Sequence, residues 1–220
     1  MTAGAPRKAG RRWKAKVSAR DQLLMAASSL MIEKETIDIP LGEIAQRAGL
    51  NSALVSYYFG GKEGLLMALA KRDTAQAIRE MDALMATDLG PEAKLRKHLA
   101  GIINFNFHYP YMTRLIHLLL RDPESENSRE ITEVFTGPVT RAQAKMLDEG
   151  MAAGVFRKID PVLFYFSSVG ACDYLFWGGS ALRFVFGHQK IDDDMRRRFI
   201  DHMVELVLHG CLAKPEKNDG

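Results

Sequence analysis

The chain has 220 residues, of which 47% are hydrophobic and 26% are charged, and these values fit one or two compact domains with a full hydrophobic core. Its most apolar stretch, residues 162–182, is interrupted by Asp173, serines and glycines, and the N-terminus lacks the apolar core of a secretory signal, so we expect a cytoplasmic protein without a membrane partner. The two cysteines, Cys172 and Cys211, are far apart and lack ligands at metal-binding spacing, which indicates buried free thiols rather than a disulfide framework or a metal site.

Basic residues are concentrated at the N-terminus, although the formal net charge of +3 is too small to indicate a partner by itself. Seven basic residues, Arg11 and Arg12 among them, and no acidic residue occur in residues 1–20. We expect residues 1–17 to form a disordered basic arm and residues 214–220 a disordered tail. Such an arm either keeps the chain in solution or contacts nucleic-acid phosphates and a minor groove.

The first predicted helix covers residues 18–34. Ser18 or Asp21 lies near its start. Its inner face is expected to consist of Leu23, Leu24, Ala27, Leu30 and Met31. Pro40 fits the first turn of the next helix, where its missing N–H has no cost.

Residues 41–59 have the pattern of two short helices joined by a tight turn. Ile44, Ala45 and Ala48 lie on one face of the first helix, and Gly49 suits a left-handed corner. Asn51 or Ser52 can cap the second helix. The apolar face of that second helix is predicted to comprise Leu54, Val55, Tyr58 and Phe59.

This pattern is typical of a helix-turn-helix, whose second helix can lie in the major groove of DNA. The alternative is an ordinary helical hairpin within a core, because short motifs of this kind also arise by chance. The basic arm before the motif and the sequence GGKEGLL after it favour DNA binding. The same context favours contact with DNA as the role of the arm.

Residues 18–70 resemble the DNA-binding domain of TetR-type (TetR/AcrR) transcriptional regulators, most closely at residues 49–51 and 58–66. The resemblance implies an all-α fold, with a helix-turn-helix domain at residues 18–64 and a helical effector-binding and dimerisation domain at residues 65–213. It implies contacts to double-stranded DNA from the second helix and a phosphate contact from the following helix. Together with the arm, the expected contact residues are Arg11, Arg12, Ser52, Ala53, Leu54, Ser56, Tyr57 and Lys62.

The predicted recognition helix offers few side chains for reading bases. It has no Arg or Gln that could form paired hydrogen bonds to guanine or adenine. Base reading would therefore depend on serine hydroxyls, on Ala53 or Leu54 against thymine methyl groups, on Tyr57, and on the shape of the DNA. Many relatives have Tyr where this chain has Ser56. Pro40 cannot supply the hydroxyl contact to phosphate that relatives make near that position.

The rest of the chain is predicted to be helical, since no stretch shows sustained β alternation. The helix that starts at Lys62 would leave the DNA-binding domain and enter the next one. The expected helices cover residues 62–85, 91–108, 111–121, 129–151, 161–178 and 194–212.

The last two predicted helices carry more apolar surface than one domain of this size can cover. Residues 161–178 are apolar nearly all round, and residues 194–212 add eight further apolar side chains. A two-fold dimer, with two helices from each subunit forming a four-helix bundle, would bury both. The alternative is a monomeric bundle core.

Aromatic and polar side chains are mixed in the middle helices, which suits an adaptable apolar cavity with a few orienting hydrogen bonds. The alternative is that most of these residues are core. A carboxylate such as that of Asp173 in an apolar helix needs a partner or a ligand. The candidate effector-binding residues are Phe105, His108, Met112, His117, Asp173, Tyr174 and Trp177.

The sequence therefore predicts a homodimeric repressor that a small, largely apolar or aromatic effector releases from a palindromic operator. A helical adaptor of the same fold that has lost specific DNA reading is the alternative. An enzyme is not expected, because no catalytic constellation, P-loop or dinucleotide turn occurs, and no cofactor is implied.

Overall fold

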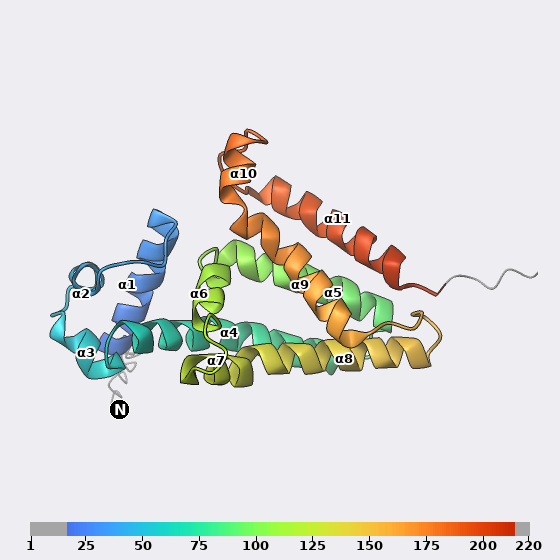
Figure 1. Cartoon of the computed structure of the whole chain (residues 1–220), viewed down its shortest axis with the longest axis horizontal. Coiled ribbons are helices and arrows are strands. Elements are labelled where there is room, and N and C mark those ends of the chain that lie inside the picture. The colour runs from blue at the N-terminus through green and yellow to red at the C-terminus, as the bar shows by residue number, and fades with distance from the viewer. Residues whose placement is uncertain (1–16, 214–220) are drawn as a thin grey trace, which may run out of the picture.

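A 24-residue helix, α4, runs from the three N-terminal helices into the C-terminal helices (Figure 1). The computed structural model describes residues 17–213, so the predicted tail and all of the predicted arm except Val17 lie outside the described residues. Within this part of the chain no strand occurs, apart from one isolated bridge between Phe156 and Leu212. The elements are α1 (Ala19–Lys34), α2 (Leu41–Ala48), α3 (Ala53–Phe59), α4 (Lys62–Met85), α5 (Pro91–His108), α6 (Met112–Leu119), α7 (Glu126–Ile131), the π-helical turn η1 (Thr132–Thr136), α8 (Gly137–Ala152), α9 (Pro161–Trp177), α10 (Gly179–Phe184) and α11 (Asp193–Cys211).

Several helices begin where the sequence predicted a cap. The Ser18 hydroxyl accepts the N–H of Asp21 at 3.0 Å in the first turn of α1. Asp160 accepts two backbone N–H groups at the start of α9, and Pro161 follows in the first turn. These local signals correctly located the starts of α1 and α9.

The helix predicted for residues 129–151 differs from the structure. It begins earlier, at α7, because the Ser125 hydroxyl accepts the N–H of Ser128 at 3.1 Å. It then passes through η1, where the N–H of Gly137 reaches the carbonyl of Thr132, five residues back. Pro138 follows and has no N–H to donate, so the regular hydrogen-bond ladder is interrupted at this point.

Three further details correct the sequence interpretation. Pro40 is the N-cap of α2, with extended backbone, rather than a residue of its first turn. The helix expected at residues 111–121 is reduced to α6, which begins after Tyr111 and ends at Leu119. The six-residue α10 was not predicted, because a helix this short carries too little periodic pattern to detect.

Two clusters of buried side chains hold the helices together. One extends from α1, α2 and α3 across the first half of α4 to α6 and α7, and includes Leu30, Val55 and Leu115. The other lies between α5, α8, α9 and α11. The predicted domain boundary at residues 64/65 falls within the first turn of α4, and it stays a prediction. No helix of the described part is long and apolar enough to cross a bilayer.

The junction between α3 and α4 depends on Gly64. A Cβ atom at this position would lie 1.8 Å from the carbonyl oxygen of Phe59. Only a residue without a side chain therefore lets the end of α3 approach the first turn of α4 this closely.

We expect Gly64→Ala to lower the free energy of unfolding by about 1–3 kcal/mol, because backbone atoms must move to admit the methyl group. Gly42→Ala in α2 is the matched control. A Cβ there meets no atom within 4 Å, so it should leave stability unchanged or raise it by up to about 1 kcal/mol. Urea unfolding at one protein concentration compares the two, and equal stability of both variants would contradict the steric argument.

Candidate nucleic-acid interface and ligand cavity

The turn between α2 and α3 is built by Gly49 and Asn51. Gly49 adopts a left-handed conformation with φ 68°, as the sequence predicted, and the N–H of Leu50 donates to the carbonyl of Ala45 at 2.9 Å. The side-chain oxygen of Asn51 accepts the N–H of Ala53 at 2.8 Å. Of the two predicted capping residues, Asn51 makes the side-chain bond. Ser52 stands at the N-cap position, and its side chain makes no capping hydrogen bond.

α3 is anchored by one residue and exposed on its other side. Val55 is completely buried in the core cluster that α1, α2 and α4 share. Ser52, Ala53 and Ser56 are exposed, and Tyr57 is 78% exposed. Leu54, the remaining predicted contact on α3, is half-buried and packs against the core cluster. A fixed helix thus presents two hydroxyls, a methyl group and a phenol to solvent.

Tyr58 corrects the sequence interpretation, which placed it in the core with Phe59. Its side chain is 39% exposed, and its ring lies edge-on to that of Tyr57 with centroids 5.0 Å apart. Phe59 does pack against the core, under the guanidinium of Arg20 at 5.3 Å. Because α3 has only seven residues, its core-facing side is short. Val55 is buried there, and Leu54 and Phe59 pack against the same core cluster. Tyr58 joins Tyr57 on the open side.

Lys62, the predicted phosphate contact, begins α4 as expected and forms an ion pair with Asp38. The hydrogen bond from Lys62 lowers the pKa of the Asp38 carboxyl. Both side chains are well exposed, and surface pairs of this kind contribute little stability. The phosphate contact expected of Lys62 stays a prediction. Arg11 and Arg12, the two expected contacts in the arm, lie outside the described residues.

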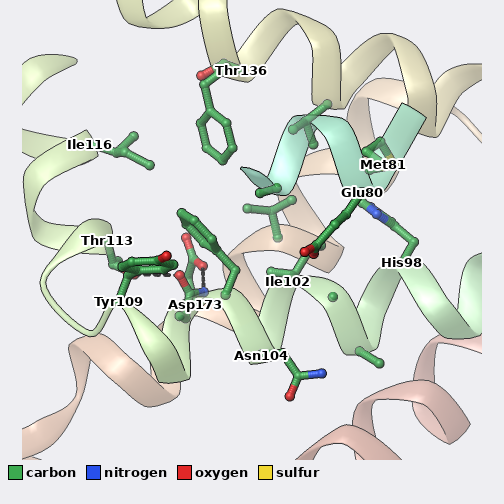
Figure 2. Close-up of a pocket in the computed structure, with 18 of the residues that line it drawn as sticks. Glu80, Met81, His98, Ile102, Asn104, Tyr109, Thr113, Ile116, Thr136 and Asp173 are labelled. Atoms are coloured by element: carbon green, nitrogen blue, oxygen red, sulfur yellow. Dashed lines mark hydrogen bonds between the residues drawn. The ribbon is translucent and has the colours of Figure 1, made fainter. Parts of the chain in front are cut away.

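A cavity of about 1800 Å³ lies between α4, α5, α6, η1, α8 and α9 (Figure 2). Six of the seven candidate effector-binding residues line it: Phe105, His108, His117, Asp173, Tyr174 and Trp177. Met112 does not, because it faces the core cluster between α6 and α4 and is completely buried there. The aromatic rings are in mutual contact, with Phe105 5.3 Å from Tyr109 and His117 5.4 Å from Trp177 between centroids.

A chain of hydrogen bonds joins three helices at one end of the cavity. The Thr113 hydroxyl of α6 donates to the amide oxygen of Asn106 at 3.3 Å. The amide nitrogen of Asn106, on α5, donates to the carboxylate of Asp173, on α9. Burial raises the pKa of Asp173, while the bond from Asn106 and the nearby His117 oppose that shift.

His98 is a polar residue of the cavity wall that sequence reasoning missed. It is 4% exposed, and one ring nitrogen lies 2.7 Å from the amide nitrogen of Gln143. Burial lowers the pKa of its imidazole from 6.5 to about 4. Its spacing of three residues from Leu95 placed it on the inner face of α5, and that was the available signal.

A second missed residue, Asp73, connects α4 to α6. Its carboxylate is 4% exposed, accepts the hydroxyl of Tyr111 and pairs with Arg72 at 2.7 Å. Burial, together with the bond to Asp73, raises the pKa of Tyr111 and keeps its hydroxyl protonated. Asp73 also lines the cavity. Among residues 17–213 no group of three or more His, Cys, Asp or Glu side chains could hold a metal ion.

Comparisons with known proteins match both halves of the chain. Residues 88–217 match the family model described as tetracyclin repressor-like, C-terminal domain, and residues 23–69 match the model of bacterial regulatory proteins, tetR family. The HTH-type transcriptional regulator BetI of Stenotrophomonas maltophilia is 36% identical over 88 residues, which are 40% of this chain and 43% of that protein. This match therefore spans less than half of BetI.

Longer matches are more distant. The HTH-type transcriptional repressor NicS of Pseudomonas putida is 27% identical over 157 residues, 69% of this chain and 72% of NicS. The crystal structure of the transcriptional regulator FadR of Bacillus subtilis, in complex with stearoyl-CoA, has a TM-score of 0.68. The match covers 86% of this chain and 98% of that chain at 21% identity, which shows a common fold.

The buried His98 gives a testable pH dependence. Below pH 6.5 the unfolded chain binds a proton at this residue, whereas the folded chain does so only near pH 4. Relative to His98→Asn, the native chain should therefore lose about 3 kcal/mol of unfolding free energy between pH 7 and pH 4.

Urea unfolding at several pH values and one protein concentration measures this difference. His209→Asn is the control, because His209 is exposed on α11 and bonds only to the carbonyl of Glu205, within its own helix. That variant should follow the native pH profile. Parallel profiles for the native chain and His98→Asn would show that burial does not hold His98 neutral.

Proposed function

Because the chain belongs to the tetR family of bacterial transcriptional regulators, we propose that it acts as a homodimeric repressor. It binds a palindromic DNA operator through α3 of each subunit. A small molecule with a largely apolar or aromatic body enters the cavity and releases the dimer from DNA.

The observation that carries this proposal is the exposed side of α3. Val55 fixes the helix to the core while Ser52, Ser56 and Tyr57 stay free. Hydroxyl groups can bond to base edges or phosphates, and Ala53 can contact a thymine methyl group. Lys62 supplies a cation beside this face, and we assign it a phosphate contact. The helix is too poor in bidentate side chains to read every base directly, so DNA shape contributes to specificity.

Dimer formation is supported by apolar residues that α9 and α11 leave in solvent. Val162, Leu163 and Phe166 on α9, and Leu206 on α11, are each more than half exposed. Apolar surface of this extent on adjoining helices marks an interface. Two copies related by a two-fold axis would cover it with a four-helix bundle and set two α3 helices about 34–36 Å apart, as a palindrome requires.

Release follows from the helices that the cavity shares with the DNA-binding end. α4 contributes Asp73 and Met81 to the cavity wall and begins at the α3 junction. α6 contributes Thr113, and the next residue, Arg114, donates to the carbonyl of Glu35 at the end of α1 at 2.8 Å. A ligand that moves α4 or α6 therefore moves the DNA-binding helices. It needs only a differential affinity of a few kcal/mol between the two arrangements.

DNA selection from a random pool at two salt concentrations tests the DNA-binding part. We expect an enriched palindrome, and at least about tenfold weaker binding to it by Tyr57→Ala. Lys62→Ala should weaken binding to all sequences and reduce the salt slope by about one. Lys145→Ala, on α8 and 65% exposed, is the control and should bind as the native chain does. Salt-sensitive binding without an enriched sequence would favour the adaptor alternative.

Sedimentation velocity tests the dimer. Leu163→Glu and Leu206→Glu each place a charge in the proposed interface and should weaken self-association by at least about 100-fold, because the charge would be buried without a partner. Met25→Glu, at a residue that is 54% exposed on α1, should remain dimeric. Dimers that persist in both interface variants would show that the dimer interface lies elsewhere on the protein.

A further inference from the structure

The wall of the cavity contains a carboxylate, that of Asp173, with which no Lys or Arg of the described residues forms an ion pair. Asp173 is the only carboxylate of α9, and this helix carries no Lys, Arg or His. Among residues 17–213 its hydrogen-bond partner is the neutral amide of Asn106, and no Lys or Arg forms an ion pair with it. The nearby His117 favours its charged form but forms no hydrogen bond or ion pair with it within the described residues. Burial acts against its charged form. A half-buried carboxylate in a cavity wall is stabilised by a counter-charge or by protonation.

The orientation of Asn106 indicates which kind of group Asp173 receives. Asn106 is 3% exposed, and the Thr113 hydroxyl donates to its amide oxygen. In this arrangement its NH₂ group donates to Asp173, whose carboxylate acts as an acceptor. A carboxylate has about four lone-pair sites, and this bond uses one of them. The remaining sites can accept hydrogen bonds from a ligand.

Aromatic side chains surround the same end of the cavity. Figure 2 shows Asp173 beside Tyr109 and Thr113, whereas Glu80, Met81 and His98 lie at the opposite end. Phe105 contacts Tyr109, and Tyr174 and Trp177 extend the aromatic wall along α9. The faces of aromatic rings attract cations, most strongly where water is excluded. Phe105 and Tyr109 are half-buried, whereas Tyr174 is 68% and Trp177 49% exposed, so the first two rings contribute most of this attraction. The carboxylate of Asp173 and the aromatic rings therefore both favour a positively charged group.

The Lys and Arg side chains of the cavity wall are paired or exposed, which argues against an anionic head group. Arg196 pairs with Asp193 at 2.9 Å, donates to Asn104, and lies over the ring of Phe107 at 5.0 Å. Lys97 is exposed to solvent. The charge of Arg196 is thus paired, although its buried Nε has no hydrogen-bond partner among residues 17–213, and the charge of Lys97 lies in solvent.

We propose that the effector is an organic cation, an ammonium group attached to an apolar body. The ammonium group binds the carboxylate of Asp173 among the aromatic rings, and the apolar body extends towards the end formed by Met81 and Ile102. This inference rests on the proposed function, since it specifies the chemical class of the ligand for the same cavity.

Three probes that share one apolar body and differ in the charge of the head group test the proposal: decylammonium, decan-1-ol and decanoate. Binding is measured by calorimetry and by the fluorescence of Trp177 in the cavity wall. We expect decylammonium to bind at least about tenfold more tightly than decan-1-ol, and decanoate to bind most weakly. Equal or tighter binding of decanoate or decan-1-ol would overturn the proposal. So would the absence of saturable decylammonium binding below about 1 mM.

Asp173→Asn is the decisive variant, because its amide oxygen can still accept from Asn106 while the charge is lost. It should bind decylammonium at least about tenfold more weakly and decan-1-ol within about twofold of the native chain. Glu80→Gln is the matched control, since Glu80 lines the opposite end and already accepts a hydrogen bond from Gln76. It should keep the preference for decylammonium. A preference that survives in Asp173→Asn would overturn the assignment.

The DNA selection is performed without any ligand, so the two proposals fail separately. An enriched operator together with a wrong probe ranking would reject the cationic effector and leave the DNA-binding regulator in place. Absence of an enriched operator would reject the proposed function, whatever the probes show.

Discussion

A buried carboxylate in the middle of α4 determines how the two ends of the molecule are joined. Asp73 is almost inaccessible to solvent, and its charge is stabilised by Arg72 and by the hydroxyl of Tyr111. Breaking such a pair would leave an uncompensated buried charge, which typically costs about 3–5 kcal/mol. α4 and the start of α6 are therefore held in one register.

That register connects the cavity to the DNA-binding helices. The first turn of α4 packs against the end of α3, and residues further along α4 line the cavity. α6 places Thr113 in the cavity wall, while Arg114 holds the carbonyl of Glu35, a residue in left-handed conformation at the end of α1. The polar chain from Thr113 through Asn106 to Asp173 then links α6 to α9. In the proposed function, a ligand bound at these three residues acts on the same helix that supports the DNA-binding end.

The elements that sequence reasoning located correctly are those with a local physical cause. Ser18 and Asp160 cap helices because an oxygen three or fewer residues away can reach a free N–H, and Gly49 turns the chain because it has no Cβ. The sequence interpretation failed where the burial of a side chain depends on residues that are distant in the sequence. Tyr58 has apolar spacing but no element to cover it. Met112 has the chemistry of a cavity residue but faces the core.

The amino-acid sequence by itself determined the helical composition, the helix-turn-helix and the family, because these depend on spacings of a few residues and on turn chemistry. Only the tertiary structure decided which polar groups contact one another. Asn106 and Asp173 are 67 positions apart, and His98 and Gln143 are 45 apart. No periodicity connects such residues. The energy of a buried polar side chain depends on the partner that packing brings to it, and packing is a property of the whole fold.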